Sequence, residues 1–213
     1  MKLKHTLLYI TKKVNSLRLK NKTFSLLCNS CIGGVIYNRT GVRFNSPTIN
    51  MGMADKDFLK FLHNLKYYLS CELTVYDDSP EAPHHFDAKL GDLSFFFGHY
   101  NTKEEVLQKW EERKKRINWD NLFVIMSDRP NGGDETKITK KDILSLQNIG
   151  CRGLAVFSTK DFDDIDYIVN LPKDKKGDYV NQYMYDKIKF LDMWRWEFKF
   201  DYVHWLNSGQ VKK

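Results

Sequence analysis

The run of residues 23–41, TFSLLCNSCIGGVIYNRTG, joins an apolar strand-like stretch, a polar turn and a helix-like segment. The apolar part ends at Cys28, Asn29 and Ser30 form the turn, and Cys31 stands where the helix would begin. A strand that enters a helix through a tight turn is the repeating unit of parallel α/β sheets. Because the first N–H groups of a helix are unpaired and carry partial positive charge, such a turn attracts anions and lowers the pKa of a thiol. The run therefore predicts both a fold unit and the place of a site.

Strand-like and helix-like segments alternate along the rest of the chain. Strands are expected at residues 23–28, 42–44, 72–76, 121–126, 152–157 and 167–171, and helices at residues 31–38, 55–69, 102–116, 139–150 and 186–206. Two more strands, 86–90 and 93–97, flank Gly91 and Asp92 and predict a β-hairpin. Such alternation implies parallel strands with helices on both faces. We therefore predict one α/β domain over residues 23–213, with three α/β/α layers, a mostly parallel sheet and one hairpin.

Residues 1–22 are predicted to form a basic amphipathic helix outside this domain. Five apolar residues at spacings of 4, 3, 4 and 3 share one face of it, and these are Leu3, Leu7, Ile10, Val14 and Leu17. Two interpretations stay open. The helix lies on an anionic membrane surface, which makes the protein peripheral at the inner face of the membrane, or it packs on the domain or a partner and keeps its lysines in water.

The net charge of +7 arises in this same segment. Residues 1–22 hold seven Lys and Arg and no acid, while the remaining 27 Lys and Arg balance the 27 Asp and Glu. A neutral body lacks the basic stripe that nucleic-acid binding requires, so no nucleic-acid partner is predicted. Four cysteines without a recognisable signal peptide indicate a reducing cytoplasm.

The predicted site lies at the carboxyl ends of the strands, where open parallel sheets bind ligands. Four loops meet this description, at residues 29–34, 45–50, 77–85 and 127–134. The residues predicted there to bind a ligand are Asn29, Ser30, Gly33, Gly34, Ser46, Asn50 and Asp128. Gly33 and Gly34 would let backbone N–H groups approach a phosphate or carboxylate, or they are a purely structural pair.

His99 follows a predicted strand in the sequence FFFGHY and is a candidate general acid or base, because the histidine pKa lies near neutrality. A structural, hydrogen-bonded histidine is the alternative. Cys28 and Cys31 form a Cys-x-x-Cys pair, but Cys28 belongs to the buried strand, so redox chemistry is disfavoured. His84 and His85 are adjacent and would point apart, so no metal site is predicted.

Trp110, Arg113 and Arg116 fall on neighbouring turns of one predicted helix. Together with Trp119 they could bind an anionic or sugar ligand through stacking and bidentate contacts. Charged residues of both signs are interleaved at 111–115, and a solvated basic face is the alternative.

Several of these motifs occur together in a known family. They are Asn29-Ser30-Cys31-Ile32-Gly33-Gly34, the FNSPTIN segment at 44–50, the helix at 57–69, Gly98-His99-Tyr100 and the WEERKKRIN segment at 110–118. Over about residues 22–200 the chain resembles a bacterial family of undetermined function with an Asn-x-Cys-x-Gly-Gly signature, whose members are labelled exopolysaccharide or capsular polysaccharide biosynthesis proteins. The resemblance implies a Rossmann-like fold and a bacterial setting beside glycosyltransferases. Ile32 departs from the larger aromatic residue expected there, and the basic N-terminal helix lies outside the resemblance.

The expected function is that of a cytoplasmic transferase that modifies a surface-polysaccharide precursor, by acyl transfer from an acyl-CoA to a sugar. Cys31 would be the nucleophile and His99 the general base, while N–H groups near Gly33 and Gly34 hold an oxyanion or phosphate. Arg113 and Arg116 would attract the phosphate of the donor or of a lipid-linked saccharide acceptor.

Two other functions remain open from the sequence. A glycosyltransferase would use a nucleotide sugar and a carboxylate, for which Asp77, Asp78 and Asp128 are candidates. A non-catalytic scaffold would dock through residues 1–22 onto a membrane-associated complex.

Overall fold

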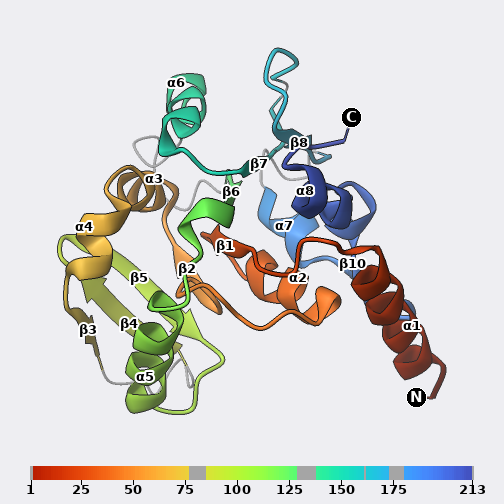
Figure 1. Ribbon diagram of the computed structural model, residues 1–213, viewed down its shortest axis with the longest axis horizontal. Coiled ribbons are helices and arrows are strands. Elements are labelled where there is room, and N and C mark those ends of the chain that lie inside the picture. Colours follow the sequence, from red (N-terminus) through yellow and green to blue (C-terminus); the bar gives the residue numbers. More distant parts are fainter. Residues whose placement is uncertain (1, 77–84, 129–137, 161, 173–179, 213) are drawn as a thin grey trace.

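The computed structural model describes residues 2–76, 85–128, 138–160, 162–172 and 180–212, and its strands form three sheets (Figure 1). A parallel sheet has the order β1 (Ser25–Cys28), β6 (Leu122–Ser127), β7 (Gly153–Ser158) and β8 (Ile168–Asn170). An antiparallel sheet has the order β2 (Met51–Met53), β5 (Leu93–Gly98), β4 (His85–Leu90) and β3 (Leu73–Val75). A short antiparallel pair joins β9 (Lys187–Ile188) and β10 (Met193–Trp194). The mixed α/β class is confirmed.

A parallel sheet is present as predicted, but it does not contain all the strands. The hairpin of β4 and β5 is the centre of a separate sheet, in which β3 and the unexpected strand β2 form the edges. Residues 42–44, expected as a strand, have no regular structure. Burial explains the division, because β1, β6 and β7 are buried at every position, whereas β4 alternates between exposed and buried residues. A two-sided apolar run suits the parallel sheet, and an alternating run suits a sheet with one exposed face.

Eight helices and three short 3₁₀ turns are described. The helices are α1 (Lys2–Arg18), α2 (Ile32–Thr40), α3 (Asp55–His63), α4 (Leu65–Ser70), α5 (Lys103–Lys114), α6 (Lys140–Ser145), α7 (Val180–Tyr185) and α8 (Tyr202–Ser208). The 3₁₀ turns are η1 (Trp119–Asn121), η3 (Leu146–Ile149) and η4 (Arg195–Phe198). The helix expected at 186–206 is wrong for most of its length, because β9, β10 and η4 occupy it and only α8 is helical. No helix in the described ranges is both long enough and apolar enough to cross a membrane.

Both faces of the parallel sheet are buried. Phe123, Ile125 and Phe157 point to one face and join a core with side chains from α2, η4 and α8. Val124 and Met126 point to the other face and join a core with α3, α6 and the antiparallel sheet. Figure 1 shows the result: the antiparallel sheet with α4 and α5 lies on one side of the parallel sheet, and α1 and α8 lie on the other. The carboxyl end of β1, an edge strand of this sheet, leads directly into α2, and α1 packs against α2.

Candidate functional site

A pocket of about 510 Å³ opens at the carboxyl end of β1 and the start of α2. Four of the residues predicted from the sequence line it together, and these are Cys31, Gly34, Asn50 and His99. The opposite wall comes from the C-terminal segment, with Lys187, Asp192 and Trp194 of the β9–β10 hairpin, and from Leu8 of α1. The structure therefore brings the predicted thiol and imidazole into one cavity.

Cys31 is the N-cap residue, directly before α2. Its backbone is already helical, with φ −68° and ψ −7°, and its side chain makes no capping hydrogen bond. Its carbonyl accepts the first helical bond, from Val35 N at 3.2 Å. The thiol is half-buried and stands beside the positive end of the helix, where negative charge is stabilised. The sequence placed this helix start correctly.

Three non-glycine residues hold a left-handed backbone in the described ranges, and all three line this pocket: Asn50 at φ 58°, His99 at φ 68° and Asp192 at φ 56°. This conformation costs about 1–2 kcal/mol for a residue with a Cβ. It persists only where the surroundings impose it, and such positions cluster at functional sites.

Strand pairing explains how Asn50 and His99 meet. Asn50 directly precedes β2 and His99 directly follows β5, and these two strands pair antiparallel with Met51 opposite Phe97. Gly98 N donates to Asn50 O at 2.8 Å, which closes this end of the pair. Both left-handed residues therefore sit at the same end of the antiparallel sheet, where it reaches the start of α2.

The two glycines of α2 have different surroundings. A Cβ on Gly33 would lie 3.2 Å from Cys28 Cβ, so this glycine lets α2 pack closely on β1. A Cβ on Gly34 would lie 3.0 Å from Asn50 Oδ1, so this glycine leaves room for the Asn50 amide. Gly33 therefore serves the packing of α2 on β1. Of the two glycines, Gly34 is the one that lines the pocket.

Asn29 and Ser30 lie behind the pocket in a buried polar network. Asn29 Nδ2 donates to Asp55 Oδ1 and to Ser127 O, each at 3.0 Å, and Asn29 Oδ1 accepts from Ser127 N at 2.9 Å. Ser30 Oγ lies 3.3 Å from Ser127 Oγ. These bonds hold the ends of β1 and β6 to the start of α3, so the two residues position the turn without lining the cavity.

Ser46 is buried in the loop that precedes β2. Its Oγ lies 3.0 Å from Thr48 Oγ1, and Thr48 Oγ1 accepts from Cys28 N, also at 3.0 Å. The last residue of β1 is thus hydrogen-bonded to this loop along the edge of the parallel sheet. Ser46 fixes the loop that carries Asn50 and does not reach the pocket.

Asp128 is buried at the end of β6, away from the pocket. Ser158 Oγ donates to its Oδ2 at 3.0 Å, and Lys160 Nζ lies 3.1 Å from the same atom. Its Oδ1 has no hydrogen-bond partner among the described residues. The loops 77–84 and 129–134, predicted to converge here with Asp77 and Asp78, lie outside the described residues.

Trp110 and Arg113 of α5 are buried, so they do not form the solvated face that was the alternative, and Arg116 lies just beyond the end of this helix. Trp110 is fully buried, and Arg113 Nη1 donates to Tyr100 Oη at 2.7 Å with its guanidinium over the Phe44 ring. Arg116 is half-buried, and its burial, with Arg43 nearby, lowers its pKa. Neither arginine lines the pocket, and ligand binding by them stays a prediction.

The C-terminal wall is the part that sequence reasoning missed. Arg39 of α2 is buried and binds Glu197 of η4 through two contacts of 3.1 Å, and it also donates to Asp192 O. Lys187 Nζ lies 2.8 Å from Asp192 Oδ1 and 5.0 Å from the centre of the Trp194 ring. Residues 194–200 read WRWEFKF, an alternation of aromatic and charged residues that argues against a continuous helix, although only Trp194 of this segment lies in a strand.

Residues 3–207 match the family described as "Domain of unknown function (DUF1919)". The chain belongs to the DUF1919 family. An uncharacterized protein of Haemophilus influenzae (strain ATCC 51907 / DSM 11121 / KW20 / Rd) is 30% identical over 196 residues, which cover 90% of this chain and 88% of the relative. The family match starts at residue 3, so α1 belongs to the DUF1919 domain. The family match therefore extends further toward the N-terminus than the resemblance at residues 22–200 did.

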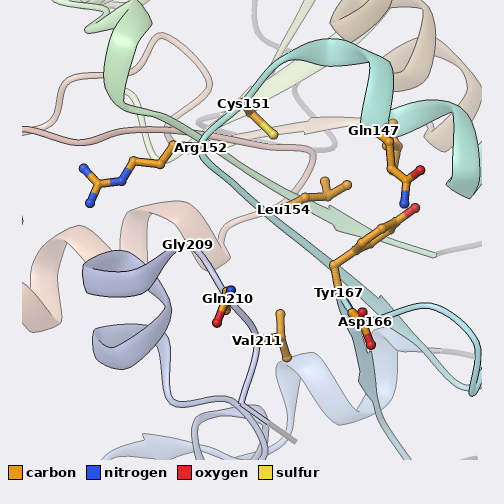
Figure 2. Close-up of a pocket in the computed structure, with 10 residues that line it drawn as sticks. Gln147, Cys151, Arg152, Leu154, Asp166, Tyr167, Gly209, Gln210 and Val211 are labelled. Carbon is orange, nitrogen blue, oxygen red and sulfur yellow. The ribbon is translucent and has the colours of Figure 1, made fainter.

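A second cavity of the DUF1919 chain, of about 570 Å³, lies at the amino end of β7 (Figure 2). Leu154 and Tyr167 project into it, whereas the Arg152 guanidinium points away and donates to Asn121 Oδ1 at 2.9 Å. Burial raises the pKa of the Cys151 thiol there, which makes it a poor nucleophile. This cavity lies at the edge opposite to the one where parallel sheets bind ligands, so the Cys31 pocket is the better candidate.

Proposed function

We propose that the chain is an acyltransferase acting on a bacterial surface-polysaccharide precursor, with an acyl-CoA as donor and a saccharide hydroxyl as acceptor. The observation that carries the proposal is the convergence of Cys31, His99 and Asn50 on one pocket, two of them on left-handed backbone. The setting in polysaccharide biosynthesis rests on the resemblance of the Asn29–Gly34 segment to the Asn-x-Cys-x-Gly-Gly signature.

The first half-reaction would load the enzyme. Cys31 Sγ attacks the thioester carbon of the acyl-CoA while the His99 imidazole accepts the thiol proton. The bond from that carbon to the CoA sulfur breaks, and the departing thiolate takes the proton from His99. The oxyanion that forms between these events lies near the first N–H groups of α2 and the Asn50 amide, both suited to stabilise it.

The second half-reaction would release the acyl group to the sugar. The saccharide hydroxyl oxygen attacks the Cys31 thioester carbon as His99 accepts the hydroxyl proton, and that proton then returns to the departing Cys31 sulfur. A cavity of this size suits a ligand of a few hundred daltons, and the Trp194 indole in its wall offers a face for a sugar ring.

A nucleotide-sugar glycosyltransferase is the weaker candidate. It would require a carboxylate beside the reacting sugar. Asp192, the carboxylate that lines the described pocket, is paired with Lys187, and Asp128 is paired with Lys160 outside it. The pocket offers a thiol and an imidazole, and these suit acyl transfer.

The test is acyl loading of the purified full-length chain. Incubation with a panel of acyl-CoAs should release free CoA and leave a thioester on Cys31, which intact mass and peptide mapping detect. Cys31→Ala should abolish both, and Cys71→Ala, the same change at a half-buried cysteine outside the pocket, should preserve both. His99→Asn tolerates the left-handed backbone and should slow loading by about 10²–10⁴-fold. CoA release by Cys31→Ala at the wild-type rate would overturn the proposal.

A further inference from the structure

The apolar stripe of α1 points away from the protein. Ile10 is 49% exposed, Val14 46% and Leu17 78%, and Tyr9 beside them is 63% exposed. The sequence predicted that Ile10, Val14 and Leu17 share a face with Leu7, and the structure shows these three side chains exposed and Leu7 half-buried. An exposed row of large apolar side chains on a soluble surface marks a contact with another molecule or a membrane.

Polar contacts from α1 to α8 fix this orientation. Asn15 is buried and donates to Tyr202 Oη at 2.7 Å, and Arg18 pairs with Asp201 at 2.6 Å, both at the start of α8. Asn207 Nδ2 also donates to Arg18 O at 3.0 Å. The helix lies beside α2 and α8 at the edge of the molecule (Figure 1). The stripe could turn inward only if these bonds broke.

The positive charge of residues 1–22 indicates which kind of partner the apolar stripe contacts. Residues 1–22 hold seven Lys and Arg without an acid, and the rest of the chain is formally neutral. Lys13, Lys20 and Lys22 are exposed, and Arg18 is the cation of this set that pairs with Asp201. Two copies that paired through α1 would bring fourteen positive charges together by this count, which opposes a second copy as the occupant. Anionic lipid headgroups complement the lysines and receive the apolar stripe at the same time.

We propose that α1 docks the protein on an anionic membrane surface, with Ile10, Val14 and Leu17 at the boundary of headgroups and acyl chains. Tyr9, with an apolar ring and a polar tip, suits the same depth. Leu8, on the inward side of the same helix, lines the Cys31 pocket, so in the docked protein this pocket lies about one helix diameter, ~10 Å, from the bilayer. A lipid-linked saccharide would then meet the pocket at the surface. That last step rests on the proposed function, whereas the docking itself does not.

Vesicle sedimentation of the full-length chain tests the docking. Binding is expected to vesicles of phosphatidylglycerol mixed with phosphatidylcholine, to be negligible with phosphatidylcholine alone, and to weaken with salt. Leu17→Ser should weaken it about tenfold or more, since the leucine side chain leaves the membrane. Leu144→Ser, the same change at an exposed leucine on α6, should leave binding unchanged. Lys13→Gln and Lys20→Gln should each weaken it about fivefold.

Undiminished binding of Leu17→Ser to the anionic vesicles would overturn the docking. A second result would also overturn it: the chain binds no vesicles and forms dimers in solution, and Leu17→Ser makes it monomeric. In that case a second copy of the chain covers the stripe. Acyl loading by soluble acyl-CoA is measured without vesicles, so a failure of the transferase proposal and a failure of the docking give separate results.

Discussion

At the scale of single residues, the candidate pocket is marked by three residues with a Cβ that hold a left-handed backbone conformation. Asn, Asp and His tolerate left-handed φ better than other residues with a Cβ, and they are the three types found at positions 50, 192 and 99. The sequence could suggest His99 from its chemistry, but nothing local to it shows that φ is positive. Asp192 was missed because its φ follows from the β9–β10 hairpin, which periodicity did not reveal.

Gly33 and Gly34, although adjacent in α2, should respond differently to substitution by alanine. Gly33→Ala should destabilise the fold by about 1–3 kcal/mol, because its Cβ would meet the buried Cys28 Cβ at 3.2 Å in a packed interface. Gly34→Ala meets only the end of the Asn50 side chain, which can rotate, and alanine favours the helix by about 1 kcal/mol. Gly34→Ala should therefore keep its stability and lose acyl loading. Urea unfolding of the two variants checks this, and equal losses of stability would contradict it.

At the scale of elements, the sequence predicted what local pattern determines. The helix caps at Thr102 and Thr139 are present, Gly150 ends its helix with φ 72°, and the β4–β5 hairpin pairs as expected. Partner choice was not predictable in the same way. The strand expected at 72–76 is present as β3 (Leu73–Val75), yet whether it joins the parallel or the antiparallel sheet depends on contacts with residues distant in sequence. The prediction of a helix over residues 186–206 is wrong for most of its length. Aromatic and charged residues alternate at 194–200, whereas an amphipathic helix repeats its apolar residues every three to four positions.

The site was predictable to the same extent. Cys31 and the start of α2 follow from a local turn, so they were found, together with His99 and Asn50 on adjoining loops. Asn29, Ser30 and Ser46 lie near that turn as predicted. Their burial, however, depends on the register in which strands β1 and β6 pair. Sequence alone gives the polarity of such residues and not the direction in which they point.

Asp201 gives a prediction about the junction of α1 and α8. Burial alone would raise its pKa, but hydrogen bonds from His204 N at 3.1 Å and from Arg18 outweigh burial and lower the pKa. A carboxyl with a lowered folded pKa stabilises the fold above its unfolded pKa of about 3.9, and that contribution is lost as the pH falls through the folded pKa. Asp201→Asn should therefore cost about 1 kcal/mol near pH 7 and almost nothing near pH 2. Denaturant unfolding at both pH values checks it, and a cost that does not change with pH would exclude the ion pair as its cause.

At the scale of the whole molecule, one buried network joins the pocket to the N-terminal helix. Arg39 of α2 binds Glu197 of η4, Tyr202 Oη of α8 donates to Glu197 Oε2 at 3.5 Å, and Asn15 of α1 donates to Tyr202 Oη. Burial, followed by the charge of Glu197, raises the pKa of Tyr202, which keeps this hydroxyl a neutral donor. The network thereby ties together α1, α2, η4 and α8, and the first three of these elements line the pocket.

The Arg39–Glu197 pair is the strongest test of that arrangement, because both side chains are almost fully buried. Arg39→Met and Glu197→Gln should each destabilise the protein by about 3–5 kcal/mol, since each leaves its partner or its neighbours without compensation in a dry interior. The double variant should cost clearly less than the sum, since no unpaired charge remains, and unfolding of all four proteins in urea measures the coupling. Purely additive costs would mean that the pair does not act as a unit. Because Arg39 also donates to Asp192 O, the single arginine variant should in addition loosen the β9–β10 wall and slow acyl loading at temperatures where the chain is still folded.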